Sequence, residues 1–322
     1  MPLPLDINRF FARYLCGGGA LNEYRQVSRM QLALANANVG YFEPNAVNLS
    51  FQIQHFLNAE QNFVDKGITE ESLCSVNQLL RKTNASSCFR TCDIKIGKRK
   101  PTGIPPKGHR VKKLMAEWFE SLNKLNGTTE TVFQCYIAFL YIHPFIDGNG
   151  RTARALLNYL YNQYSIEKMA PDIYRLKNVK ESSFGQQIND FKNSAEFLIN
   201  KKLNNETFFN DYLKWEDEFR EGIEKKIHAV ESTLKNKMAM LESNINSSQF
   251  LELLWRFPVI THEKLCQLLE VSKKEAKEII DAYINLSVLE VKKLKSLPNQ
   301  VFLIAPPITN LLNELDEQLF KS

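Results

Sequence analysis

The sequence has no long hydrophobic run. Its 322 residues contain no stretch of about 18 uncharged apolar residues, which is the length that a helix needs to cross a bilayer. Residues 1–6, Met-Pro-Leu-Pro-Leu-Asp, carry neither the basic block nor the apolar block of a secretory signal. We therefore expect no membrane partner and no membrane-embedded function.

Cysteine and histidine are scarce and scattered. Of six cysteines, only Cys88 and Cys92 lie close together, and no second pair or histidine follows at zinc spacing. The five histidines are far apart and none forms an HExxH pair, which disfavours a metal hydrolase. This usage predicts reduced thiols and a cytoplasmic protein, and leaves open its delivery elsewhere by an export machine.

The excess of positive charge is small. Lysine and arginine number 41 against 36 acidic residues, a net charge of +5, which does not by itself indicate a nucleic-acid partner. The hydrophobic fraction of 44% is ordinary for a globular protein, and 322 residues are enough for two domains.

One segment, residues 143–154, concentrates polar chemistry. Residues 133–142 before it are apolar and aromatic, which predicts a buried helix, and residues 153–161 resume a helical apolar pattern. The polar cluster is therefore predicted to form a short loop and the first turn of the next helix. Gly148 and Gly150 allow a tight turn and the close approach of a ligand. Backbone N–H groups at the start of that helix can receive phosphate oxygens.

The residue types in this segment suit a nucleoside triphosphate. His143 titrates near neutral pH, so it can take a proton from an incoming hydroxyl. Asp147 offers a hard oxygen ligand for Mg²⁺. Arg151 and Arg154, on one helix face, offer forked donors to the β- and γ-phosphates. Phe145 is predicted to pin the loop to the core.

Residues 143–154 read HPFIDGNGRTAR and resemble the core motif of Fic-domain proteins, HPFx(D/E)GNGRxxR, at every fixed position. The resemblance implies a mostly α fold, a Fic-type helical bundle with a short β-hairpin flap. It implies a protein adenylyltransferase that uses ATP and Mg²⁺, moves AMP to a Ser, Thr or Tyr hydroxyl of a protein and releases pyrophosphate. His143 would be the base and Asp147 the metal ligand. The nucleotide would be bound by the residues that follow: Gly148, Asn149 (to an α-phosphate oxygen), Gly150, Arg151 and Arg154.

A segment upstream of the motif resembles the Fic flap. Residues 93–96 alternate like a short strand, and residues 97–106 are rich in turn formers, just before a predicted helix over residues 108–125. The resemblance implies that Thr102, Gly103 and Ile104 hold the backbone of a target peptide, as strand addition does. The alternative is a basic, solvated loop.

An inhibitory motif of many Fic proteins, (S/T)xxxE(G/N), has no match in this chain. The nearest segment is residues 50–55, in which Ser50 aligns and Gln54 stands where the glutamate belongs. This alignment implies a weak latch opposite Arg154 and substantial basal self-modification, because a neutral amide binds a cation less tightly than a carboxylate does. The alternatives are an ordinary amphipathic helix and inhibition by a partner protein.

The C-terminal part predicts a separate unit. A charged stretch without proline, residues 216–245, predicts a long connecting helix. Residues 248–257 predict a helix, and Thr261 and Ser272 are predicted caps of two more. Residues 288–295 and 301–305 then predict two strands around Pro298 and Asn299. This order resembles the winged helix-turn-helix domain often attached to Fic cores.

The function of this tail is left open between two classes. Lysines on its third helix and wing would favour DNA binding, and acidic residues dilute the positive charge of that helix. The alternative is a protein-interaction or homodimer-forming module. The lysines are Lys273, Lys274, Lys277, Lys292, Lys293 and Lys295, and the acidic residues are Glu275, Glu278 and Asp281.

The predicted organisation has four parts: an N-terminal helical region (1–70), a Fic catalytic core (71–215), a connecting helix (216–246) and a winged-helix domain (247–322). Another transfer on the same fold remains possible, such as removal of AMP or transfer of a phosphate or phosphocholine. A Doc-like phosphotransferase motif usually has lysine where Gly150 stands, so AMP transfer is favoured. A different class, a DNA-binding regulator or nucleotide sensor, also stays open.

Overall fold

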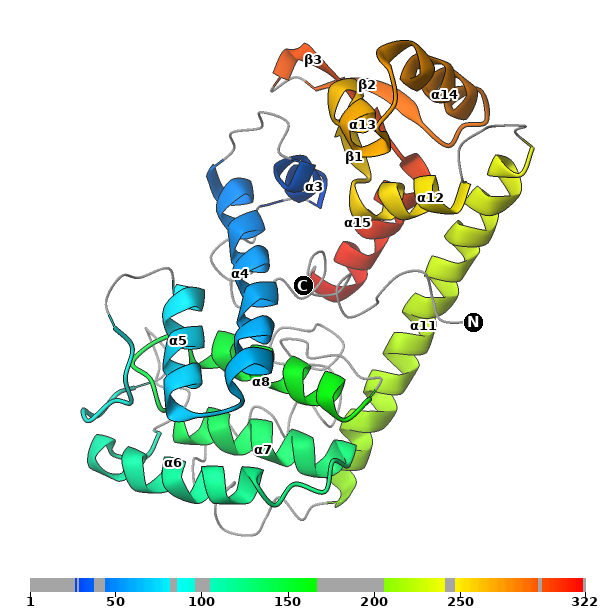
Figure 1. The fold of residues 1–322 in the computed structure, drawn as a ribbon. Helices are drawn as coiled ribbons and strands as arrows, with labels where there is room; N and C mark the ends of the chain where they lie inside the picture. The colour runs from blue at the N-terminus through cyan, green and yellow to red at the C-terminus, as the bar shows by residue number, and fades with distance from the viewer. Residues whose placement is uncertain are drawn as a thin grey trace. The chain divides into compact units, whose positions relative to one another are not determined.

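The structure is a computed structural model that describes residues 27, 29–37, 44–81, 86–95, 105–166, 206–240, 247–294 and 297–320. The described chain is mostly helical and carries one small sheet (Figure 1). No helix among these residues is both long and apolar enough to span a bilayer. The helices that precede and carry the motif are α3 (Arg29–Ala37), α4 (Pro44–Lys66), α5 (Glu70–Arg81), α6 (Gly108–Leu122), α7 (Thr129–Ile142) and α8 (Asn149–Gln163). The later elements are α11 (Glu206–Met238), α12 (Ser247–Arg256), β1 (Val259–Thr261), α13 (His262–Leu269), α14 (Lys273–Asn285), β2 (Glu290–Leu294), β3 (Leu297–Ile304) and α15 (Pro306–Phe320).

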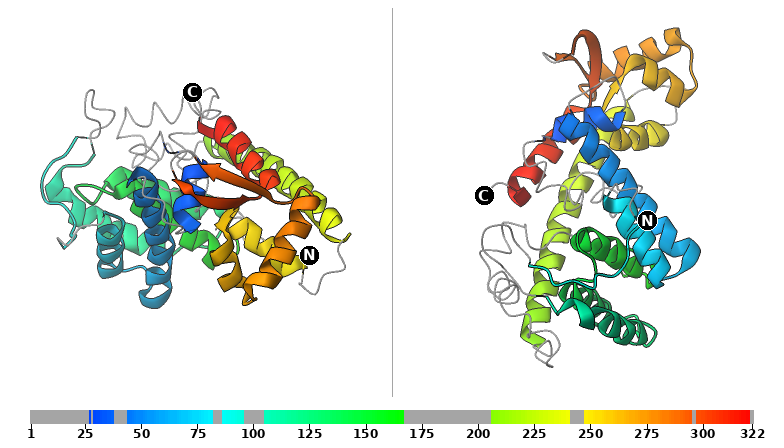
Figure 2. Two further views of the ribbon diagram at one scale, coloured as in Figure 1. Left: turned by 90° about the horizontal axis from the view of Figure 1, so that it is seen from above. Right: turned by 90° about the vertical axis from the view of Figure 1, so that its left-hand side faces the viewer.

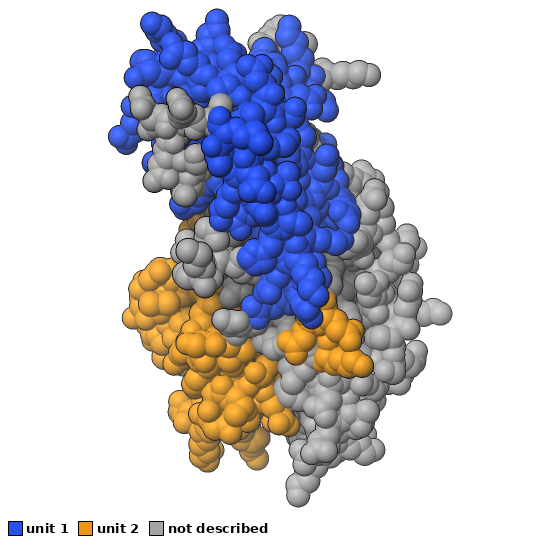
Figure 3. Space-filling view, turned by 90° about the vertical axis from the view of Figure 1, so that its right-hand side faces the viewer, with its two compact units in different colours: residues 1–10, 22–51, 220–321 blue, residues 11–21, 52–219, 322 orange. Residues whose placement is uncertain are grey.

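The chain divides into two compact units (Figure 3). The motif unit comprises residues 11–21, 52–219 and 322, and the second unit comprises residues 1–10, 22–51 and 220–321. Helices α4 and α11 each contribute residues to both units. The domain limits expected from the sequence stay predictions.

In the motif unit, α7 packs against α6 and α8, and α5 packs against α8 (Figures 1 and 2). The apolar sequence of α7 explains its central place, since most of its side chains are buried. On α6, the indole N–H of Trp118 donates to the carbonyl of Cys135 at 3.0 Å, and its ring lies 5.5 Å from that of Phe139. Burying each such side chain contributes roughly 1.5–3 kcal/mol.

The ends of α7 and α8 define the loop between them. Helix α7 begins where the hydroxyl of Thr128 accepts a hydrogen bond from the N–H of Thr131. It ends at His143, whose φ of 49° is left-handed. Helix α8 begins after Gly148, with φ of 82°. Residues 143–148 are therefore a short loop between two buried helices, as the sequence predicts.

The expected helices over residues 72–82 and 108–125 are confirmed as α5 and α6, with shifted ends. The expected strand over residues 93–96 is wrong in its described part, because residues 93–95 form no strand. Asp93 is engaged elsewhere, since its carboxylate accepts a hydrogen bond from the Gly108 N–H at 2.7 Å. The predicted flexible glycines at 17–19 lie outside the described residues.

The second unit contains an antiparallel sheet in the order β1-β3-β2. Val259 and Glu290 both pair with Ile304, so β3 is central. The predicted caps are confirmed: Thr261 accepts from the N–H of Lys264, and Ser272 forms a capping box with Glu275. The predicted order of three helices and two strands is also confirmed, whereas the winged-helix assignment stays a prediction.

Some details of this unit differ from the expectation. Pro298 and Asn299 do not form the turn between the strands, because β3 begins at Leu297 and includes both residues. Strand β1 and helix α15 were not expected. Helix α11 begins earlier than predicted and is lined with (i, i+4) ion pairs such as Arg220–Glu224 at 2.8 Å, which suits its highly charged sequence.

Candidate functional site

The imidazole of His143 is held in place through one of its two ring nitrogens. Its Nδ1 lies 3.2 Å from the carbonyl oxygen of Leu140. A carbonyl can only accept, so this contact places the proton on Nδ1 and leaves the lone pair on Nε2. Burial lowers the pKa of His143 to about 4; the hydrogen bond to Leu140 opposes this shift, the charge of Arg90 adds to it, and the charge of Asp147 opposes it. The imidazole is therefore neutral at pH 7 and able to accept a proton.

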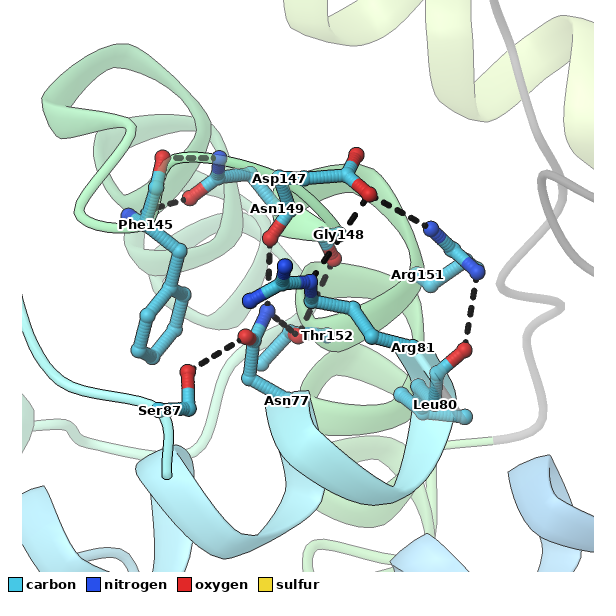
Figure 4. A network of polar contacts seen from close by, with 10 residues as sticks. All are labelled: Asn77, Leu80, Arg81, Ser87, Phe145, Asp147, Gly148, Asn149, Arg151 and Thr152. Atoms are coloured by element: carbon cyan, nitrogen blue, oxygen red, sulfur yellow. Dashed lines mark hydrogen bonds and ion pairs between the residues drawn. The ribbon is translucent and has the colours of Figure 1, made fainter. Parts of the chain in front are cut away.

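Phe145 and Asn149 close the loop that follows. The ring of Phe145 is buried, and its centroid lies 5.5 Å from that of Phe89 and 6.4 Å from that of Phe139. This confirms its predicted packing role. The Asn149 side chain accepts from the N–H of Phe145 at 2.8 Å and donates to its carbonyl at 2.7 Å (Figure 4). Both of its polar atoms thus fasten the loop. The predicted bond from this amide to an α-phosphate would require it to leave Phe145, and that role stays a prediction.

The start of α8 offers backbone donors. The first N–H that is bonded within the helix is that of Thr152, to the carbonyl of Gly148 at 3.0 Å. The N–H groups of residues 149–151 precede that bond, at the positive end of the helix dipole. A Cβ at Gly148 would lie 2.7 Å from Nδ2 of Asn77 and 2.9 Å from Cγ of Arg81, so no side chain fits there.

A buried asparagine on α5 fixes this helix start. Asn77 is fully buried, and its Nδ2 donates to the carbonyl of Asp147 at 3.0 Å and to the hydroxyl of Thr152 at 3.1 Å. Its Oδ1 accepts from the hydroxyl of Ser87 at 2.6 Å (Figure 4). Three chain segments therefore meet at one amide, which keeps the helix start in place.

Three guanidinium groups surround the same helix start. Nη2 of Arg151 and Nε of Arg81 lie 3.4 Å and 3.8 Å from Oδ2 of the exposed Asp147 carboxylate. Arg151 also donates to the carbonyl of Leu80 at 2.8 Å (Figure 4). Arg154 is buried, and a Cβ at Gly150 would lie 3.4 Å from its Nη1. Arg81 and Arg151, which flank the Asp147 carboxylate beside a helix N-terminus, favour a polyanionic ligand.

The predicted flap residues Thr102, Gly103 and Ile104 lie outside the described residues. The segments on either side of them are in contact. A Cβ at Gly108 would lie 2.2 Å from the carbonyl oxygen of Thr91, so the two backbones approach as closely as glycine permits. With the Asp93–Gly108 hydrogen bond, this contact brings the two ends of the segment together.

The predicted latch residues are bonded elsewhere. The hydroxyl of Ser50 donates to Oδ1 of Asn36 at 2.5 Å. Gln54 is exposed, and its amide bonds to Asn58 one turn along α4 at 3.0 Å, not to the buried Arg154. In this structure Gln54 therefore does not stand opposite Arg154, because it lies on the outer face of α4. On the inner face, Glu60 accepts from the side-chain amides of Asn158 and Asn162 of α8.

The site's core matches a known family. In residues 67–161 the chain is similar to the Fic/DOC family. The match covers α5 to α8 for most of their length, including the whole of residues 143–154. Members of this family commonly transfer nucleotide or phosphate groups onto proteins.

Two solved structures are also similar. A Fic family protein from Desulfovibrio desulfuricans G20 has 15% identity and a TM-score of 0.44, with 92% of this chain and 86% of that chain covered. A Fic domain containing signaling protein from Bacteroides thetaiotaomicron VPI-5482 has 18% identity and a TM-score of 0.48, with 67% of this chain and 87% of that chain covered.

The structure brings the predicted residues of the motif into one place and adds three that sequence reasoning missed. These are Asn77, Arg81 and Arg90. Asn77 had a signal, since it is a polar residue on the apolar face of α5 that Leu73, Val76 and Leu80 form. Arg81 and Arg90 lie outside any recognisable motif, so only the fold reveals their position.

Proposed function

We propose that this protein is a protein adenylyltransferase, which transfers AMP from ATP to a Ser, Thr or Tyr hydroxyl of a protein, with its own chain among the acceptors. The observation that carries this proposal is a neutral imidazole at one end of a six-residue loop (143–148) whose other end is a cationic helix start. A general base beside a polyanion site is the minimum that nucleotidyl transfer requires.

The chemical step follows from the two ends of the loop. Nε2 of His143 takes the proton of the acceptor hydroxyl, and the hydroxyl oxygen forms a bond to the α-phosphorus. The bond from the α-phosphorus to the bridging oxygen breaks, and pyrophosphate leaves with that electron pair. The N–H groups of residues 149–151 and the guanidinium groups of Arg151 and Arg154 stabilise the phosphate oxygens.

The residues present fit one Mg²⁺ bound with the nucleotide. Asp147 is exposed and aimed away from the core, and no group of three or more His, Cys, Asp or Glu side chains among the described residues forms a full metal cage. Mg²⁺ is commonly held by one carboxylate together with substrate phosphates and waters. Asp147 would hold it, and the ion would supply charge neutralisation to the phosphates.

Gly150 supports AMP transfer over other transfers. A Doc-like phosphotransferase motif usually has lysine at this position, and a Cβ at Gly150 would lie 3.4 Å from Nη1 of Arg154, at the near limit of ordinary contact. Both motif arginines, Arg151 and Arg154, would bind the triphosphate tail.

Radiolabelled ATP distinguishes the possible transfers. The protein is incubated with ATP labelled at the α- or the γ-phosphate, with Mg²⁺, and covalent label is counted after denaturation. AMP transfer predicts label from the α-position only. Label from the γ-position alone would show phosphate transfer, and no label with any acceptor protein would contradict a transferase.

DNA binding by residues 247–322 is a second candidate. Lysines at 273, 274 and 277 of α14 and at 292 and 293 of β2 are all exposed, which favours it. Acidic residues at 275, 278, 281 and 290 are exposed on the same elements and oppose it. A gel shift with random duplex decides: binding at low salt that weakens as salt rises supports this function, and no binding at low salt rejects it.

A further inference from the structure

Arg90 is a buried arginine that binds four carbonyl oxygens. Its side chain is 3% exposed. Nε donates to the carbonyl of His143 at 2.7 Å, and Nη1 donates to that of Cys92 at 2.9 Å. Nη2 donates to the carbonyls of Pro106 at 2.7 Å and Ile142 at 3.2 Å. One planar group thus joins three separate stretches of chain.

Its first partners are the carbonyls at and just beyond the C-terminal end of α7. The backbone N–H of Arg90 adds a bond to the carbonyl of Pro144 at 2.8 Å, so three consecutive carbonyls, of residues 142–144, all bind this residue. Carbonyls at a helix C-terminus have no partner within the helix and form the negative end of its dipole. A guanidinium there satisfies both their hydrogen bonding and their charge.

Its other partners lie on the two segments that meet before α6. Cys92 lies two residues after Arg90, and Pro106 lies two residues before Gly108, where that helix begins. The bond from Gly108 to Asp93 joins the same two segments. Arg90 therefore connects the end of α7 to both of them.

Shape makes arginine suited to this position. Among the described residues, no carboxylate lies within ion-pair distance of Arg90, and neutral carbonyls hold its charge. The guanidinium presents its N–H groups in a rigid plane, so its partners are fixed relative to one another. A lysine has one nitrogen on a flexible stem and cannot reach all four carbonyls.

We infer that Arg90 is a positioning residue for His143, one that fixes the base by its own carbonyl and ties it to the segments 91–93 and 105–108. This inference rests on the proposed role of His143 as the base. His143 needs such support because its left-handed backbone, with φ of 49°, is costly for a residue that is not glycine. The charged groups that face the imidazole are Arg90 and Asp147, and they act on its pKa in opposite directions.

Arg90→Lys tests this role, with Arg110→Lys as the matched control, since Arg110 is exposed on α6. Binding of a fluorescent ATP analogue and the rate of AMP transfer are measured for each. We expect kcat to fall by about tenfold to a hundredfold in Arg90→Lys, because small displacements of a reacting group are costly. We expect the nucleotide Kd to stay within about twofold, because Asn77 and Arg151 hold the nucleotide end. The Arg110→Lys variant should behave as wild type.

Two kinetic results would overturn the inference. One is an unchanged kcat in Arg90→Lys. The other is a nucleotide Kd that rises as much as kcat falls, since that pattern indicates general damage to the fold. The midpoint of the acid limb of the pH profile is a third readout. A displaced His143 should shift this midpoint in Arg90→Lys relative to the wild type.

A measurement on the wild type needs neither a variant nor activity. Native-state hydrogen exchange should give the amides of Arg90 and Gly108 the same protection factor within about threefold. The reason is that the bonds around Arg90 hold the segments 91–93 and 105–108 together, so both should open in one event. Clearly different protection would overturn the joining role. A wild type without AMP transfer would overturn the proposed function. The exchange result would still decide whether Arg90 holds the two segments together.

Discussion

The side-chain amide of Asn77 donates to the hydroxyl of Thr152 at 3.1 Å, across 75 positions of sequence. The same nitrogen donates to the carbonyl of Asp147 at 3.0 Å. A residue of α5 thereby fixes both the last turn of the loop and the first turn of α8. The geometry of the anion-binding end depends on this single buried amide.

Replacing Asn77 by alanine should destabilise the fold and weaken nucleotide binding. The change removes a partner of the buried Thr152 hydroxyl and of the part-buried Asp147 carbonyl and Ser87 hydroxyl, which costs about 1–3 kcal/mol. Urea unfolding and binding of an ATP analogue measure both effects. Gln78→Ala on the same helix is the control and should change stability by less than about 0.5 kcal/mol. Equal effects of the two substitutions would contradict the role given to Asn77.

Two glycine-to-alanine substitutions should act in opposite directions. Gly148→Ala forces a side chain into a φ of 82° and to 2.7 Å from Asn77, so it should cost about 1–3 kcal/mol and weaken nucleotide binding. Gly222→Ala places a methyl in open space within α11 and should stabilise by about 0.5–1 kcal/mol. Thermal unfolding compares the pair. Similar shifts in Tm for both would show that the turn at position 148 is not tight.

The pH profile of kcat/KM should report the half-buried base, His143. Because burial lowers the pKa of His143 to about 4, the acid limb should have its midpoint well below 6.5. The folded pKa lies below the unfolded one, so the linked contribution to stability is full above pH 6.5 and is lost as the pH falls from there towards 4. An acid limb with its midpoint at 6.5 or higher would contradict a desolvated imidazole.

Gln54→Glu should leave basal self-modification within about twofold of wild type, because an exposed side chain that bonds to Asn58 has little effect on the site. Gln61→Glu adds the same charge elsewhere on α4, where Gln61 bonds to Asp65, and serves as the control. Autoradiography with α-labelled ATP measures both. A strong loss of label in Gln54→Glu alone would instead support the latch that the sequence predicts.

Local patterns predicted the loop of residues 143–148 well. An apolar run must end where polar residues and glycines begin, so α7, the loop and α8 follow from residues 133–161 alone. The caps at Thr261 and Ser272 are equally local. Such signals depend on neighbours along the chain, which a sequence shows directly.

The sequence failed to predict features whose partners are distant in the chain or whose sequence patterns are short. Arg90 meets the carbonyl of His143 across 53 positions, and no pattern near Arg90 indicates that contact. Residues 93–96 alternate over too few positions to specify a strand. Helix α15 did carry a signal, because Pro306 stands at its first position, where proline is favoured.

The mass of the intact protein after incubation with ATP and Mg²⁺ tests the central claim most directly. The wild type should gain an AMP group, about four times the mass of a phosphate, on itself or on an added acceptor protein. His143→Ala should gain none, and His109→Ala, which changes an exposed histidine on α6, should match the wild type. Equal modification of the wild type and His143→Ala would contradict the account, because the base would then lie elsewhere.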